Sequence, residues 1–178
     1  MPRLFIGIGF NEEECAYFLL LQDLLRKICN KGRYTDPANF HLTLNFLGDL
    51  PDEKIPPLID LINTLEVEKM TLWGEHIGFF AKKRGCIAYL GFKPQTNLSI
   101  LAQRLNGKLE DAGLKTPEIF IYTPHITLCR QARFMTPLVD ISKGLDILKE
   151  LAIANITLFE SINLDGQLRY RPIYIRSL

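Results

Sequence analysis

The chain has 178 residues, of which 47% are hydrophobic and 23% are charged, and its formal net charge is +1. These values predict a globular protein large enough to bury a core, and they exclude a disordered or low-complexity chain. The small net charge argues against broad, non-specific binding of nucleic acid. It leaves room for a local contact with an RNA end or a single phosphate.

The four cysteines form no C-x-x-C pair and have no zinc-type spacing, so we expect free thiols in a reducing compartment. The opening MPRLFIGIGF has no secretory pattern, and no apolar run approaches the roughly 20 residues that span a bilayer. These features predict a cytoplasmic protein with no membrane partner.

The first third of the chain predicts strands and helices in turn. RLFIGIGF (3–10) is a compact apolar run typical of a strand. Asn11 suits an N-cap, and a helix should follow, with Lys27, Lys31 and Gly32 as residues that suit its end. Its expected buried face consists of Tyr17, Leu20, Leu21, Leu24, Leu25 and Ile28. FHLTLNFLG (40–48) predicts a strand, and a helix should begin near Pro57.

The remaining elements are predicted mainly as strands. MTLWGEHIGFF (70–80) and CIAYLGF (86–92) read as two strands joined by a basic tip, and residues 97–112 read as an amphipathic helix. Three further strands are expected at IYTPHITLCR, LAIANITLF and LRYRPIYIR, with NLDGQ as the turn between the last two. Because strands and helices do not alternate strictly, an α+β fold is favoured.

Two of the three histidines open the same tetrapeptide, His-x-Thr-Leu, at His41 and His125. Side chains alternate faces along a strand, so each motif should present an imidazole and a hydroxyl side by side, with Thr43 beside the first histidine and Thr127 beside the second. The two copies are 84 residues apart (125 − 41), which is near half the chain and hints at a duplication.

This set of side chains suits a phosphodiester. One imidazole can accept a proton from water while the other donates a proton to the leaving alkoxide. The threonine hydroxyls can donate to the non-bridging oxygens, where negative charge gathers. The chemistry requires no metal, and we expect neither a metal nor another cofactor.

The repeated HLTL and HITL resemble the paired motifs of the two-histidine phosphoesterase superfamily. RLFIGIGF, NFHLTLNFLGDL, TPHITLCR and ITLFESINLDGQLRYRPIYI extend the resemblance over nearly the whole chain. They are similar to the branch of RNA 2′,3′-cyclic phosphodiesterases, formerly called 2′-5′ RNA ligases.

The resemblance implies a single α+β domain, 1–178, of two pseudo-symmetric lobes, with two antiparallel sheets around a cleft and helices outside. It also implies hydrolysis of a terminal 2′,3′-cyclic phosphate on RNA to a 2′-phosphate. In that scheme His41 is the proton donor, His125 is the proton acceptor, and Thr43 and Thr127 hold the phosphate. The residues alone leave open which histidine is the acid. The expected partner is an RNA end or a small cyclic nucleotide, and the expected state is a monomer.

The sequence departs from the family in places. Asn45 stands where a lysine is common, and Cys129 stands where an alanine is common. We expect Cys129 on the cleft face with His125, as a packed thiol rather than a nucleophile. Strict alternation points Arg130 away from His125, but a bend in the strand would let it bind phosphate rather than form a surface ion pair.

Other polar and aromatic residues have a structural explanation that we prefer over a functional one. The basic tip at 82–84 is expected to be a solvated turn rather than an RNA contact. Tyr122 and Tyr170 are expected to pack in the core or rim rather than to stack on a terminal base. His76, with no threonine two residues on, is expected on a strand surface.

Three alternatives stay open from the sequence. The same site could carry out 2′-5′ ligation or hydrolyse 2′-5′ linkages. A non-catalytic module for RNA ends or nucleotides would keep phosphate contacts but has no need of two matched histidines. A histidine metal site is a poor third, because neither motif has neighbouring Cys, Asp or Glu ligands.

Overall fold

The computed structural model describes residues 1–115, 121–135 and 147–178. Within these ranges the chain is a mixed α+β protein in which strands predominate. The strands are β1 (Arg3–Gly9), β2 (Cys29–Tyr34), β3 (His41–Asp49), β4 (Thr71–Lys82), β5 (Gly85–Phe92), β6 (His125–Phe134), β7 (Lys149–Ala152), β8 (Asn155–Leu164) and β9 (Gln167–Ser177). The α-helices are α1 (Glu12–Arg26), α2 (Ile55–Asn63) and α3 (Thr96–Asp111), and the short 3-10 helices are η1 (Pro37–Asn39) and η2 (Asp52–Lys54).

The strands follow the order β7-β4-β5-β6-β3-β1-β8-β9, and β2 pairs with β6 off this path. All of the registered strand pairs are antiparallel. The path divides into two halves of four strands, which meet where β3 lies beside β6 through the single registered pair Leu42–Ile126. The predicted α+β class is confirmed, but the strands form one nine-stranded sheet instead of the two expected sheets, because the β3–β6 pair joins its two halves.

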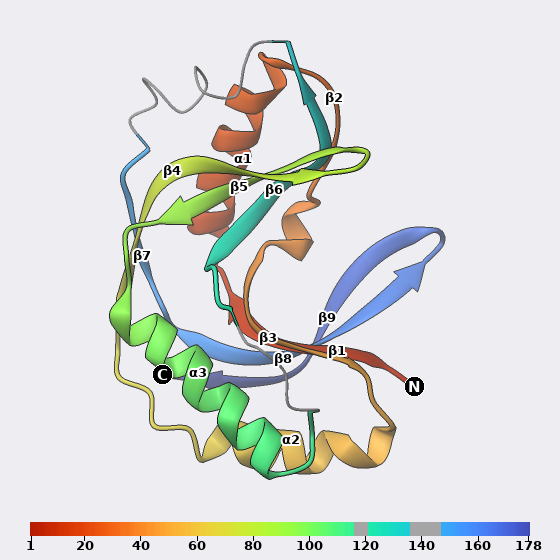
Figure 1. Ribbon diagram of the computed structural model, residues 1–178, viewed down its shortest axis with the longest axis vertical. Coiled ribbons are helices and arrows are strands. Elements are labelled where there is room, and N and C mark those ends of the chain that lie inside the picture. The colour runs from red at the N-terminus through yellow and green to blue at the C-terminus, as the bar shows by residue number, and fades with distance from the viewer. Residues whose placement is uncertain (116–120, 136–146) are drawn as a thin grey trace.

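The helices cover the two halves from outside (Figure 1). Helix α1 lies behind β5 and β6, whereas α2 and α3 lie beneath β1, β3 and β8. Asn11 and Glu14 form a capping box that starts α1. The buried face of α1 was predicted wrongly in part. Phe18 is fully buried, while Leu20 is 62% exposed, because the face of α1 that packs on the core runs through Phe18, Leu21 and Leu25.

One strand was not predicted from the sequence. The segment CNKGRY forms β2, so the preceding helix does not reach Lys31 and Gly32, two of the three residues expected at its end. Helix α1 instead ends at Arg26 with Lys27 as its C-cap. β2 is an edge strand whose side chains are mostly exposed, so it lacks the apolar alternation that marks a half-buried strand.

The other predicted elements lie close to their expected positions. The run LAIANITLF is not one strand but two, because β7 ends at Ala152 and β8 begins at Asn155. The buried face of α3 is confirmed, with Leu98, Leu101, Ala102, Leu105 and Leu109 all in the core. No helix in the described ranges is long and apolar enough to cross a membrane. The single domain of two pseudo-symmetric lobes stays a prediction.

Candidate active site

The two His-x-Thr motifs meet at the junction of the two half-sheets. Leu42 and Ile126, the middle residues of the two motifs, form the register pair that joins β3 to β6. In an antiparallel pair the flanking residues then lie across from each other, so His41 faces Thr127 and Thr43 faces His125. Two segments far apart in the sequence thus bring both imidazoles and both hydroxyls to one place.

Both imidazole rings are held in the same way. His41 Nδ1 lies 2.8 Å from the carbonyl oxygen of Asn39, and His125 Nδ1 lies 2.8 Å from that of Thr123. A carbonyl only accepts hydrogen bonds, so Nδ1 is the donor in each ring. In each neutral ring Nε2 is therefore the unprotonated nitrogen, available to take a proton.

Aromatic rings surround each histidine. The ring centroid of His41 lies 4.8 Å from that of Phe5 and 4.7 Å from that of Tyr170. The centroid of His125 lies 5.0 Å from that of Phe80 and 5.4 Å from that of Tyr89. These rings fix the orientation of the imidazoles and exclude water from one side of each.

Both histidines are neutral near pH 7 in the absence of a ligand. The pKa of His41 is lowered to about 4, mainly because burial desolvates the ring. The hydrogen bond to the Asn39 carbonyl opposes this effect, whereas electrostatic repulsion from Arg130 and His125 adds to it. Desolvation also lowers the pKa of His125, with a smaller contribution from Arg130. A bound phosphate would oppose this effect, because its negative charge favours the protonated imidazole.

A pocket of about 370 Å³ opens beside His41, and Thr127, Arg130 and Tyr170 are among its lining residues. We call it the His41 pocket. Its other charged lining residues are Arg33, Arg169 and Asp36, of which the last two form an ion pair. Three guanidinium groups against one carboxylate make this pocket electropositive, which suits a phosphate.

Arg130 and Cys129 exchange the sides that strict alternation assigns to them. Neighbouring residues of β5, Tyr89 and Ala88, pair with Thr127 and Cys129, so Leu128 is an extra residue in β6. Such a bulge reverses which side chains face which side of the sheet. Arg130 therefore lines the His41 pocket, whereas Cys129 is fully buried and does not share the cleft face as expected.

The sequence analysis missed Asn39. Its side-chain amide donates to the carbonyl of Leu168 (2.8 Å) and accepts from the backbone N–H of Tyr170 (2.9 Å), while its own carbonyl holds His41. Asn39 thus ties the β8–β9 hairpin to the first motif. Its position two residues before His41 was the only available signal, and residue type alone does not reveal this role.

The basic tip, Tyr122 and His76 lie in the structural positions that the sequence analysis preferred over a functional role. The tip residues Lys82, Lys83 and Arg84 are exposed on the β4–β5 hairpin. Tyr122 packs inward and donates a hydrogen bond to the carbonyl of Thr43, so it supports the first motif rather than stacking on a base. His76 is on β4 with its side chain 45% exposed beside Glu75.

Comparisons with known proteins agree with this geometry. The sequence model of the family described as LigT like Phosphoesterase matches residues 9–88, which include the first motif. The structure of Escherichia coli LigT complexed with 3′-AMP is 28% identical and superposes with a TM-score of 0.80, covering 100% of this chain and 99% of that one. The chain is similar to the two-histidine phosphoesterases in both sequence and fold.

Further relatives of this phosphoesterase are found among bacteria and archaea. The RNA 2′,3′-cyclic phosphodiesterase of Thermotoga maritima is 27% identical over 72% of this chain and 69% of its own length. The protein of the same name from Archaeoglobus fulgidus is 25% identical over 78% of each chain. These alignments extend over more than two thirds of each relative.

No group of three or more His, Cys, Asp or Glu side chains that could hold a metal ion occurs in the described part of this phosphoesterase. The two histidines that meet at the β3–β6 junction have aromatic and hydroxyl side chains around them instead.

Proposed function

We propose that this phosphoesterase hydrolyses a terminal 2′,3′-cyclic phosphate on RNA to a 2′-phosphomonoester, without a metal, by paired histidine acid–base catalysis. The observation that carries the proposal is the juxtaposition of the two His-x-Thr motifs through the Leu42–Ile126 pair. The relatives named RNA 2′,3′-cyclic phosphodiesterase support the substrate class. A soluble, cytoplasmic enzyme that acts as a monomer is part of the same proposal.

The chemistry follows from the two Nε2 atoms. In the proposed step His125 takes a proton from water as the water oxygen attacks phosphorus. The bond from phosphorus to the 3′ oxygen breaks, and His41 donates its proton to that oxygen. Because His41 is neutral in the empty site, it must gain its proton when the anionic phosphate binds.

The hydroxyls and one guanidinium hold the phosphate in this scheme. Thr127 and Arg130 line the His41 pocket, and Thr43 lies across from His125 at the other end of the junction. Their donors would face the non-bridging oxygens from both half-sheets, and charge gathers on those oxygens in the transition state. Thr127→Val should therefore lower kcat, whereas Thr127→Ser should largely retain it.

The first experiment supplies a short RNA ending in a 2′,3′-cyclic phosphate, in the presence of a chelator. The parent protein should produce the 2′-phosphate, while His41→Ala and His125→Ala should each lose about 100- to 10,000-fold in kcat. His76→Ala, the third histidine of the chain, is the matched control and should keep full activity. Activity that survives loss of either motif histidine, or that disappears with chelator, would contradict the proposal.

The assignment of acid and base needs its own test. A substrate with sulfur in place of the bridging 3′ oxygen leaves as a thiolate and needs little protonation. His41→Ala should recover much of its rate on this substrate, and His125→Ala should not. The opposite pattern would exchange the two roles without affecting the paired mechanism.

A further inference from the structure

Three of the four cysteines lie close together where β2 and β5 both pair with β6. Cys29 is in β2, Cys86 in β5 and Cys129 in β6. A Cβ placed on Gly32 would lie 3.4 Å from the sulfur of Cys29 and 2.5 Å from that of Cys129. The two sulfurs can therefore be no farther apart than the sum of these distances. The sulfur of Cys129 thus occupies space that any side chain at position 32 would need.

The three thiols differ in their access to solvent. Cys86 and Cys129 are buried, whereas Cys29 is half-buried. The pKa of Cys129 is raised to about 12, mainly because burial desolvates its thiol. Cys29 and Cys86 add to this effect, and Arg26 opposes it. Because the thiolate is the reactive form of a cysteine, an oxidant from solvent should react with Cys29 before Cys129.

The hydroxyl of Tyr34 is an unpaired polar group at the same place. Tyr34 pairs with Cys129 across β2 and β6, and its buried oxygen has no hydrogen-bond partner in the described ranges. Desolvation, followed by the nearby Cys29 thiol, raises the pKa of this phenol. A buried donor without an acceptor destabilises the folded state. An oxygen atom added to the sulfur of Cys29 would supply the acceptor that Tyr34 lacks.

We propose that Cys29 and Cys129 form a disulfide bond when the protein meets a hydroperoxide. With hydrogen peroxide, the Cys29 sulfur attacks one oxygen, the O–O bond breaks, and water leaves a sulfenic acid on Cys29. The Cys129 sulfur then attacks the Cys29 sulfur, the S–O bond breaks, and a second water leaves. The two thiols lose two electrons and two protons, and the peroxide is reduced to two waters. The second step needs no access to solvent, because the partner sulfur is adjacent.

The disulfide acts on the His41 pocket through β6. Arg130 directly follows Cys129, it pairs with Arg33 of β2, and both arginines line the pocket. The bond brings the two sulfurs closer than any non-bonded contact, so β2 and β6 must shift at Cys29 and Cys129. The two guanidinium groups move with their strands, and phosphate binding should weaken. Only this coupling to the pocket rests on the proposed function; the disulfide itself does not.

The first measurement is mass spectrometry after brief treatment with hydrogen peroxide and alkylation of the remaining thiols in the unfolded state. The parent protein should lose two alkylation sites, and proteolysis should give one pair of linked peptides that contain Cys29 and Cys129. Dithiothreitol should restore both thiols. No linkage, or a linkage that joins Cys86 instead of Cys129 to Cys29, would overturn the proposal.

Single substitutions separate the two steps. Cys29→Ser removes the sulfur that meets the peroxide first, so Cys129 should remain open to alkylation after the treatment. Cys129→Ala removes the second sulfur, so Cys29 should stop at the sulfenic acid, which dimedone traps as an adduct of defined mass. Absence of this adduct at Cys29, in a Cys129→Ala protein that unfolds cooperatively, would overturn the assigned order of steps.

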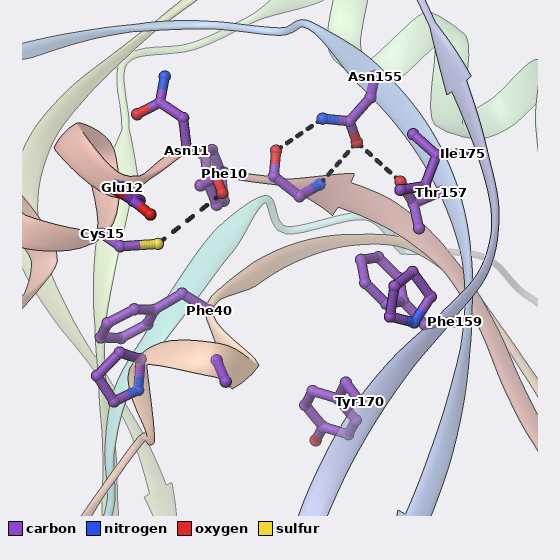
Figure 2. A pocket seen from close by; sticks show the side chains of 14 residues that line it. Phe10, Asn11, Glu12, Cys15, Phe40, Asn155, Thr157, Phe159, Tyr170 and Ile175 are labelled. Atoms are coloured by element: carbon purple, nitrogen blue, oxygen red, sulfur yellow. Dashed lines mark hydrogen bonds between the residues drawn. The ribbon is translucent and has the colours of Figure 1, made fainter.

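Cys15→Ser is the matched control. Figure 2 shows Cys15 on the wall of a separate pocket, with its thiol donating to the carbonyl of Phe10 (3.9 Å). Like Cys29, Cys15 is half-buried and its sulfur donates to a backbone carbonyl. The Cys15→Ser protein should form the Cys29–Cys129 linkage at the rate of the parent. Loss of the linkage in this variant would contradict the proposed pair.

Calorimetry with inorganic phosphate tests the coupling to the pocket and needs no turnover. The oxidised parent should bind phosphate about tenfold more weakly than the reduced parent, as expected for the loss of a charge-assisted hydrogen bond. Peroxide-treated Cys29→Ser should keep the affinity of the reduced parent. Equal affinities of the oxidised and reduced parent would overturn the coupling. If the reduced parent hydrolysed no cyclic phosphate but formed the linkage, the proposed function would fall and the disulfide site would stand.

Discussion

The imidazole of His41 sets a pH dependence that can be worked out from its surroundings. Burial lowers its pKa to about 4, below the ordinary value of 6.5. As pH falls from about 6.5 toward 4, the unfolded chain binds a proton that the folded His41 does not, so the free energy of unfolding decreases over this window. The contribution of this one group is on the order of 3 kcal/mol.

Urea unfolding at pH 7 and pH 4 measures this effect. His41→Gln removes the titrating group, so its free energy of unfolding should decline less than that of the parent between these two pH values. The His41 resonance in NMR should titrate near pH 4 in the free protein and at higher pH with adenosine 2′-phosphate bound. Parallel stability curves for parent and variant would show that His41 is not the desolvated group.

The place of some residues in the candidate site can be predicted from the sequence, and that of others cannot. His41 and His125 could be predicted because a scarce residue type recurs in a repeated phrase. Asn39 could not, because its partners Leu168 and Tyr170 lie 129 and 131 residues away and one of its bonds uses only its backbone. The orientation of Arg130 depends on the bulge at Leu128, and no residue type at that position specifies an extra residue in the strand.

At the scale of elements, β1 and β3 approach so closely that a side chain is excluded between them. A Cβ on Gly7 would lie 2.7 Å from the carbonyl oxygen of Leu42. Gly7 also pairs with Thr43, so displacement of β1 would shift the first motif. Gly7→Ala should lower the free energy of unfolding by about 1–3 kcal/mol and lower kcat as well.

Gly107→Ala is the control for this substitution. Gly107 lies inside α3, and a Cβ there would meet nothing within 4 Å. Alanine should therefore stabilise the protein by up to about 1 kcal/mol through helix propensity. Midpoints of urea unfolding at constant slope measure both effects. A Gly7→Ala protein as stable as the parent would show that β1 can move away from β3 without cost.

The elements themselves were predictable where one face is buried. The core strands β1, β3 and β8 and the helix α3 carry the expected apolar patterns and are deeply buried. β2 escaped prediction because its residues are polar and its place depends on pairing with β6, about a hundred residues later. The local pattern of apolar residues indicates which face of an element is buried. The position of an exposed edge strand depends instead on a pairing partner that is distant in the sequence.

For the molecule as a whole, charge is concentrated locally rather than spread. The net charge is +1, yet Arg33, Arg130 and Arg169 gather at the His41 pocket, where Asp36 pairs with Arg169. Two or three phosphate contacts are therefore expected for a bound RNA end. The logarithm of the binding constant should fall against the logarithm of salt concentration with a slope of about −1.4 to −2.1.

Fluorescence anisotropy with a short 2′-phosphorylated RNA at several salt concentrations measures this slope. Arg130→Ala should make it shallower by about 0.7, the value for one phosphate contact on a single strand. Lys83→Ala, on the exposed tip of the β4–β5 hairpin, should leave it unchanged. A steep slope in the parent that becomes shallower in Lys83→Ala would instead indicate that RNA extends over the hairpin tip.

The single registered pair at Leu42 and Ile126 has a mechanical consequence. If the two half-sheets rock against each other about that point, displacement grows with distance from it. The two imidazoles lie one residue from this pivot, so their separation would change little. The parts of the two half-sheets that are far from the pivot would move much more. Opening for substrate entry and product release would then leave the distance between the two histidine Nε2 atoms almost constant.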